Sequence, residues 1–282
     1  AVRTGDGKVW SPRNANGEYD KCIKLRDALA HSVNVPTARL MKAVGPRVVA
    51  EYAYRMGIRT QLEEVYSLAL GTTDLQVLEL ASAYTTFANQ GRWVEPHFIK
   101  RIEDRNGNVL ETFVPNSRKA LSEETAALMI DMLRAVVNKG TAVGLRYQHE
   151  LGQEIDICGK TGTTNDNTDG WFVGFTPRWT TAVWVGHADQ AVHFRTTLLG
   201  QGAKLALPVW GIYMKSVYKD PEMKIKPRRF DIEDDLEMRV QTDCKLYAKE
   251  YPENTCANIG EEAESSYDLG DGLEEDFGGE FD

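Results

Sequence analysis

The sequence predicts an α/β protein in which a mostly helical region precedes an antiparallel sheet that a last helix closes. Two observations predict this class. Apolar residues recur at helical spacing over most of the first 150 residues, whereas short strand-like runs with short connections follow Gly152. Hydrophobic residues make up 42% of the 282 residues, which suits a soluble core, and no apolar run approaches the ~18 residues of a membrane-spanning helix.

The chain is predicted to begin with an extended, turn-rich segment of about twenty residues. A helix is expected over 24–31, then a break at 32–34, then a resumed helix. Pro36 fits the first turn of the resumed helix because a missing N–H costs nothing there. Another short helix is expected over 46–56.

Next, the sequence predicts a helix and a hairpin. Thr73-Asp74-Leu75-Gln76 has the pattern of a capping box, in which the Thr and Gln side chains satisfy free backbone donors, and it should open a helix that ends near Asn89. The runs 98–102 and 109–112 should pair as a β-hairpin. Its turn contains Asn106-Gly107, a pair that tolerates positive φ.

The second half of the chain supplies the sheet. Ser122 is predicted to cap a helix with apolar residues at helical spacing. Three strand-like runs follow, joined by short connections that imply antiparallel neighbours. They span 155–163, 171–175 and 180–185, and a further helix is expected from about 203 to 218.

The charge is concentrated at the C-terminal end. The net charge is −9, and the stretch 261–282 holds ten Asp or Glu and no Lys or Arg, so the remainder is close to +1. A neutral body lacks the basic face of a nucleic-acid-binding protein. We expect a folded domain over 1–220, divided into 15–151 and 152–220, then a polar extension over 221–260 and a disordered acidic tail over 261–282.

The four cysteines indicate no metal site. Cys22 and Cys158 are isolated in the sequence and expected to be buried as small apolar residues. Cys244 and Cys256 lie close together and would pair in an oxidising compartment or stay reduced elsewhere. The cysteines lack metal-ligand spacing and the five histidines form no cluster, so we expect no metal and no cofactor.

Lys160-Thr161-Gly162-Thr163 lies late in the first predicted strand and suits the binding of an anion at a strand edge. Lysine supplies charge, the hydroxyls donate hydrogen bonds, and glycine leaves room for a ligand. A phosphate-binding loop is the rival interpretation. It fails because Glu154 stands where that loop requires glycine, and because a strand rather than a helix contains the motif.

Ser32-Val33-Asn34 lies at the predicted break between two helices. A hydroxyl and an amide on such a turn can point into a cleft together, although Ser and Asn are also the usual capping residues. Considered alone, the capping interpretation is favoured. In serine acyl-transferases, however, a Ser-x-Asn element precedes Lys-Thr-Gly, and here the two stand in that order.

The surroundings of both motifs resemble class A penicillin-binding proteins over roughly residues 15–220. The resemblance rests on Ala30-His31-Ser32-Val33-Asn34-Val35-Pro36, Leu78-Glu79-Leu80-Ala81, Gly159 through Thr164-Asn165-Asp166, Trp171-Phe172-Val173-Gly174-Phe175-Thr176-Pro177, Val183-Trp184-Val185-Gly186 and Ala206-Leu207-Pro208-Val209-Trp210. It implies the penicillin-binding serine transferase fold.

The resemblance also implies an activity: D,D-transpeptidation, the serine acyl transfer that crosslinks peptidoglycan stem peptides and is trapped by penicillins. Ser32 and Lys160 would relay protons, Asn34 would bind the acyl-side amide, and Thr161 and Thr163 would bind the terminal carboxylate beside Gly162. The Thr163 backbone N–H would be one oxyanion donor. The whole protein would be anchored at the extracytoplasmic face of the bacterial membrane and would also be a glycosyltransferase.

One family element is missing. The nucleophilic Ser-x-x-Lys should precede Ser32 by several dozen residues, but the one such string is Ser216-Val217-Tyr218-Lys219, far downstream in the closing helix. We therefore expect the N-terminal part of the fold to be supplied elsewhere and this chain, although soluble, to be inactive alone. A β-lactamase and a non-catalytic penicillin-sensing module are the alternatives.

Overall fold

The computed structural model describes residues 2–3, 9–19, 22–230, 232, 236, 246 and 249. The chain divides into two compact units. The first comprises Ala1–Glu18 and Ile23–Leu236, and the second comprises Tyr19–Cys22 and Glu237–Asp282.

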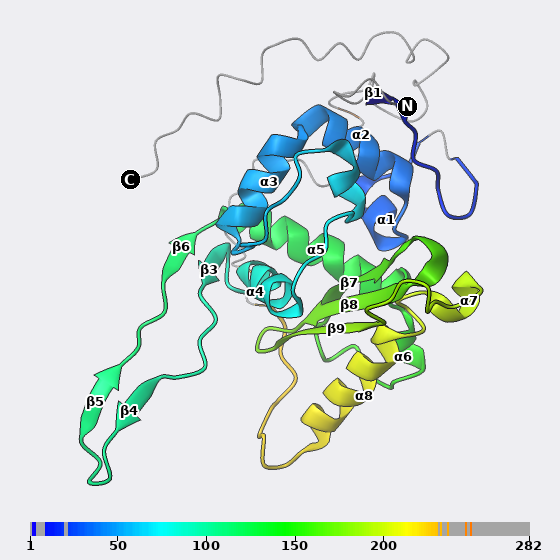
Figure 1. The fold of residues 1–282 in the computed structure, drawn as a ribbon. Coiled ribbons are helices and arrows are strands. Elements are labelled where there is room, and N and C mark those ends of the chain that lie inside the picture. Colours follow the sequence, from blue (N-terminus) through cyan, green and yellow to red (C-terminus); the bar gives the residue numbers. More distant parts are fainter. Residues whose placement is uncertain are drawn as a thin grey trace. The chain divides into compact units, whose positions relative to one another are not determined.

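The first unit contains the predicted succession of helices followed by an antiparallel sheet and a helix (Figure 1). The helices are α1 Leu25–Ala30, α2 Asn34–Val44, α3 Pro46–Arg55, α4 Val77–Ala88, α5 Glu123–Lys139, α6 Gly144–Tyr147, α7 Thr197–Gly200 and α8 Ala206–Lys219, with 3₁₀ turns η1 Tyr66–Leu70 and η2 Asn165–Asn167. The strands are β1 Val2–Arg3, β2 Val9–Trp10, β3 Arg92–Val94, β4 Arg101–Glu103, β5 Val109–Thr112, β6 Ser117–Lys119, β7 Cys158–Thr163, β8 Asp169–Phe175 and β9 Thr180–Gly186.

The main sheet has the order β7-β8-β9 and is antiparallel, as predicted. Helices cover both of its faces. On one face the Phe172 ring packs edge-on against Trp210 of α8, with ring centroids 5.3 Å apart. On the other face Phe175 packs with Phe87 of α4, and the Cys158 thiol donates to the Ile130 carbonyl of α5 at 3.3 Å. Since side chains alternate along β7, Lys160 and Gly162 share the Cys158 face.

The two predicted helix caps have opposite outcomes. Ser122 caps α5, because its hydroxyl accepts from the Thr125 N–H at 3.1 Å. The capping box at Thr73–Gln76 is wrong: α4 begins at Val77, and its N-cap Gln76 makes no side-chain capping bond. The amphipathic pattern of α4 is a better indicator of this helix than the capping pattern, because the apolar side of α4 buries Ala83 and Phe87 in the core.

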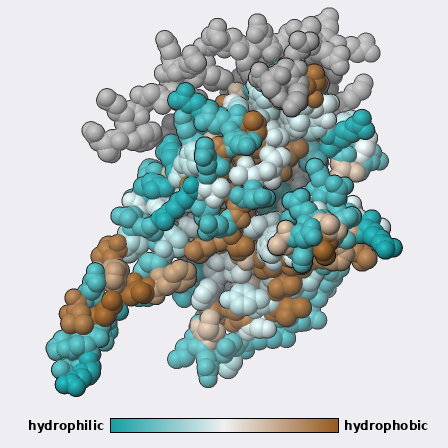
Figure 2. Space-filling view, in the orientation of Figure 1, coloured by the Kyte–Doolittle hydropathy of each residue, from teal (hydrophilic) through white to brown (hydrophobic). Residues whose placement is uncertain are grey.

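The predicted hairpin is confirmed as β4 paired with β5, although β4 begins at Arg101 rather than near residue 98. It projects from the rest of the unit (Figure 1), and apolar side chains lie along it in the open (Figure 2), with Phe98 87% and Val114 84% exposed. The pairing of β3 with β6 at its base was not predicted. Those short strands lack the alternation that marks a strand in a sequence.

The segment after α8 returns to the body of the first unit. The Phe230 ring lies 5.6 Å from that of Phe175, and the Phe230 N–H donates to the Asp156 carboxylate at 3.2 Å. Arg134 of α5 donates two hydrogen bonds to the same carboxylate, at 2.7 and 2.8 Å.

The cysteines correct one prediction. Cys158 is free and fully buried, as expected. Cys22 is not an isolated core residue: it is disulfide-bonded and only partly buried. Cys244, Cys256 and the acidic stretch 261–282 lie outside the described residues.

Candidate active site

Ser32 occupies the sharp turn between α1 and α2. Its N–H donates to the Leu29 carbonyl at 3.2 Å and the Val33 N–H donates to the Ala28 carbonyl at 2.8 Å, the bond pattern of a Schellman motif. The Ser32 φ is +56°, at the position of the motif that glycine usually fills. A left-handed backbone costs an L-residue about 1–2 kcal/mol. The turn therefore presents a hydroxyl at the expense of some backbone strain.

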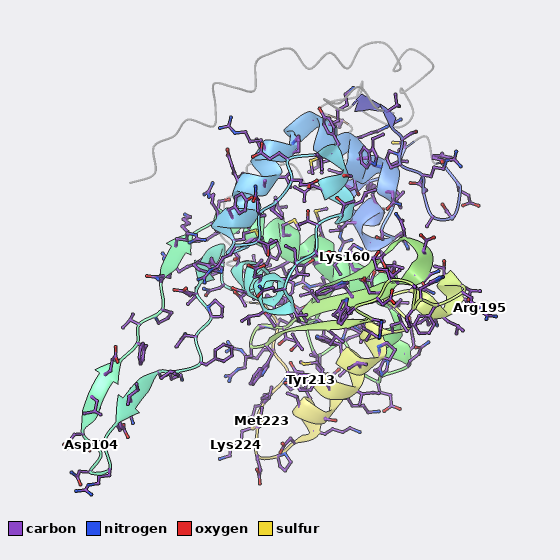
Figure 3. All side chains as sticks on the ribbon, in the orientation of Figure 1. Asp104, Lys160, Arg195, Tyr213, Met223 and Lys224 are labelled. Carbon is purple, nitrogen blue, oxygen red and sulfur yellow. The ribbon has the colours of Figure 1, made fainter. Side chains whose placement is uncertain are left out.

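Lys160 of β7 meets this turn directly. Its Nζ donates to the Ser32 Oγ at 2.8 Å and to the Thr161 carbonyl at 2.8 Å, so residues 128 apart in the sequence form one contact. Figure 3 marks Lys160 at the sheet, well inside the unit, and Asp104 at the tip of the remote hairpin. Burial lowers the pKa of the Lys160 ammonium from 10.5 to about 8.

This pKa matters for chemistry. A lysine near pKa 8 exists both as ammonium and as amine at mildly alkaline pH, and so can give and accept protons. The Ser32 hydroxyl can pass such a proton on because it both donates and accepts. The pair therefore has the composition and the geometry of a proton relay.

The two threonines that follow Lys160 are held by different partners. The Thr163 Oγ1 accepts from the Gly202 N–H at 3.0 Å, which leaves its own O–H free to donate. The Thr161 Oγ1 lies 2.7 Å from the Thr141 Oγ1, and either hydroxyl can be the donor. Alternation along β7 directs both threonine side chains to the face opposite that of Lys160, and either hydroxyl can donate to an anion at the strand edge.

Gly162 has a packing reason in addition to the predicted one. A Cβ at this position would lie 3.0 Å from the Cβ of Trp171, its partner across the β7–β8 pair. A side chain there would crowd the neighbouring strand whether or not a ligand approaches.

Asn34 begins α2, two residues after Ser32. Its Nδ2 donates to the Arg13 carbonyl at 2.8 Å, while the neighbouring Val35 N–H donates to the Asn14 Oδ1 at 2.9 Å. The turn is thus tied to the segment that precedes α1. The carbonyl oxygen of the Asn34 amide remains as the group that can accept from a substrate N–H.

Ser216 takes no part in the contacts among Ser32, Lys160 and the threonines. It lies exposed on α8, where its hydroxyl donates to the Ile212 carbonyl at 3.0 Å. Helix α8 covers the Phe172 face of the sheet, opposite to the face that carries Lys160.

Thr141 was missed by the sequence analysis. It follows the C-cap Gly140 of α5, and the short string Gly-Thr at a helix end carries no specific signal. Its contact with Thr161 is a tertiary one and is visible only in the structure.

Two further features bear on the site. A cavity of about 160 Å³ opens between α4, α5 and the segment around Phe230, but it is lined by none of the predicted site residues.

Over the described residues, no His, Cys, Asp and Glu side chains gather in groups of three or more suited to a metal. Nor does any described helix combine the length and the apolar character of a membrane span.

Comparison with known proteins identifies similar sequences and folds. The family model for the penicillin binding protein transpeptidase domain matches residues 3–197. Penicillin-binding protein 1A of Aquifex aeolicus is 40% identical over 227 residues, and that of Neisseria meningitidis is 39% identical over 225; each alignment covers 78% of this chain.

Solved structures agree. Penicillin-binding protein 1A of Haemophilus influenzae superposes with a TM-score of 0.68 at 27% identity, over 80% of this chain and 39% of that one. PonA1 of Mycobacterium tuberculosis, solved in complex with penicillin V, gives 0.64 at 25% identity, over 82% and 65%. This chain spans only 30% and 27% of the lengths of the two curated relatives.

Proposed function

Because this chain belongs to the class A penicillin-binding proteins, we propose that it forms the anion-binding and proton-relay side of a peptidoglycan D,D-transpeptidase site. The observation that carries the proposal is the 2.8 Å contact between the Lys160 Nζ and the Ser32 Oγ. It unites the two motifs that the family uses together, although they lie 128 residues apart.

The substrate side is proposed as follows. The terminal carboxylate of a D-Ala-D-Ala stem peptide, or that of a β-lactam, binds the Thr161 and Thr163 hydroxyls near Lys160. Asn34 accepts from the acyl-side amide. The Thr163 N–H acts as one oxyanion donor, and Gly162 leaves the strand edge open for the substrate backbone.

The proton path follows from the same geometry. When an acyl bond forms, the departing D-alanine nitrogen needs a proton. The Ser32 hydroxyl can supply it and regain one from the Lys160 ammonium, with which it already shares a hydrogen bond.

The nucleophile is not part of this arrangement. We propose that Ser216 does not serve, since its helix covers the opposite face of the sheet, and that the chain alone neither crosslinks stems nor forms a penicilloyl adduct. A Ser-x-x-Lys helix supplied by further polypeptide would complete the site. In the whole protein, which we place at the outer face of the cytoplasmic membrane, a glycosyltransferase would accompany it.

The test is labelling with fluorescent penicillin, followed by a denaturing gel and peptide mass mapping. The purified chain should remain unlabelled. Addition of a polypeptide that carries the family's Ser-x-x-Lys helix should produce a label on that polypeptide, and Lys160→Met should abolish it. A label at Ser216 of the chain alone would sink the proposed division of the site.

A further inference from the structure

We propose that Thr141 is a positioning residue that aims the Thr161 hydroxyl at the substrate carboxylate and fixes the Ser32 turn against β7. This inference rests on the proposed function, in that it assumes an anion at Thr161. It assigns a role to the end of α5, which neither motif includes.

The backbone at Gly140 and Thr141 holds the helix that leads to Ser32. The Thr141 N–H donates to the Ala30 carbonyl at 3.0 Å, and Ala30 is fully buried. A Cβ on Gly140 would lie 2.1 Å from the same carbonyl oxygen, so the two segments approach as closely as glycine permits. Ala30 precedes Ser32 by two residues. The placement of the Ser32 turn therefore depends on the end of α5.

The side chain of Thr141 acts on the other motif. Its Oγ1 lies 2.7 Å from the Thr161 Oγ1, a distance typical of a hydroxyl–hydroxyl bond. A hydroxyl has one proton to donate. Thr161 can donate to a carboxylate only when it accepts from Thr141, so a bound anion selects the direction Thr141 to Thr161 to carboxylate. Successive hydrogen bonds in such a chain polarise and strengthen one another.

Thr163 provides an internal comparison. Its hydroxyl accepts from the Gly202 backbone N–H at 3.0 Å, a donor that cannot rotate. The Thr163 hydroxyl thus has an external donor that frees its own proton, and Thr141 can be that donor for Thr161. For Thr163 this donor belongs to the backbone, whereas for Thr161 it is a side chain that a substitution can remove.

The experiment measures how well the chain discriminates a carboxylate from an amide. The 282-residue chain is titrated with an N-acylated peptide ending in D-Ala-D-Ala and with the same peptide bearing a C-terminal amide. We expect the wild-type chain to prefer the carboxylate. Thr141→Val, which keeps the shape and removes the hydroxyl, should lower that preference about tenfold without changing the affinity for the amide. Thr141→Ser should retain it.

The controls separate the possible failures. Thr161→Val is the reference variant and should lose the whole preference for the carboxylate peptide over the amide peptide. Thermal unfolding verifies that each variant is folded. Should the valine variant not fold, Thr141→Ala tests the same loss. If Thr161→Val loses the preference and Thr141→Val or Thr141→Ala keeps it, the role of Thr141 is refuted while the proposed function stands. If the wild-type chain does not distinguish the two peptides, the proposed carboxylate site fails and this inference fails with it.

Discussion

Replacing Lys160 by methionine should change both the stability of the chain and its dependence on pH. Burial lowers the pKa of Lys160 from 10.5 to about 8, so below pH 8 the folded state carries the full cost of a desolvated ammonium. Between pH 8 and 10.5 the unfolded chain still holds this proton and the folded chain releases it. Wild-type stability therefore gains a contribution that rises with pH over that window, by up to about 3 kcal/mol.

Methionine occupies similar space without a charge, so the variant lacks this contribution. It also loses the hydrogen bonds to Ser32 and to the Thr161 carbonyl, together worth about 1–2 kcal/mol at any pH. At pH 7 we expect Lys160→Met to be more stable than the wild type by about 1–2 kcal/mol. Above pH 10.5 it should be less stable by a similar amount.

The assay is urea unfolding of both proteins at several pH values from 7 to just above 10.5, with the difference in unfolding free energy plotted against pH. Groups common to both proteins cancel in that difference. Lys42→Met, on the exposed face of α2, is the matched control and should give a constant difference. If the Lys160→Met difference is also constant, the ammonium is not desolvated and the reasoning is refuted.

Two other substitutions test the supports of the site. Ser32→Gly should be more stable than Ser32→Ala by about 0.5–1 kcal/mol in urea unfolding. Glycine relieves the strain at φ +56°, but its larger conformational entropy in the unfolded chain offsets part of that stabilisation. Equal stabilities of the two variants would contradict the strained turn. Asp156→Asn should cost about 3 kcal/mol in the same measurement, since it removes the carboxylate that Arg134 bonds twice and leaves it only the more distant Asp131, at 4.0 Å. A loss under 1 kcal/mol would mean that solvent reaches this pair.

The elements with a strong periodic signal were predictable from the sequence. Helix α5 and the strands β7 to β9 lie where the spacing of apolar residues predicted them. An element that buries one face has apolar residues at its own structural repeat, so their spacing indicates whether a helix or a strand forms. The cap at Thr73–Gln76 failed for the converse reason: a capping pattern is a few polar residues long, and tertiary packing decides whether the helix begins there. The β3–β6 pair was missed because Arg92 and Ser117–Lys119 carry no alternation.

For the site, residue types were predictable and partners were not. Order along the chain brought Ser32 and Lys160 into one hypothesis. Nothing in either motif, however, indicates the partners of its other residues, which are Thr141 for Thr161, Gly202 for Thr163 and Arg13 for Asn34. Those contacts join segments far apart in the sequence. Such pairing is a property of the packed fold, and a motif contains no record of it.

Helix α1 shows why this matters for the chemistry. It has six residues, too few to be stable alone, so the Ser32 turn at its end is placed by what α1 packs against. That neighbour is α5: Arg26 pairs with Asp131, Asp27 with Lys139, and the Ala30 carbonyl accepts from Thr141. Helix α5 also packs against β7, where the Cys158 thiol donates to the Ile130 carbonyl of α5. Helix α5 thus sets the separation of Ser32 and Lys160, and a change on its α1 face can disturb the relay while both motifs stay intact.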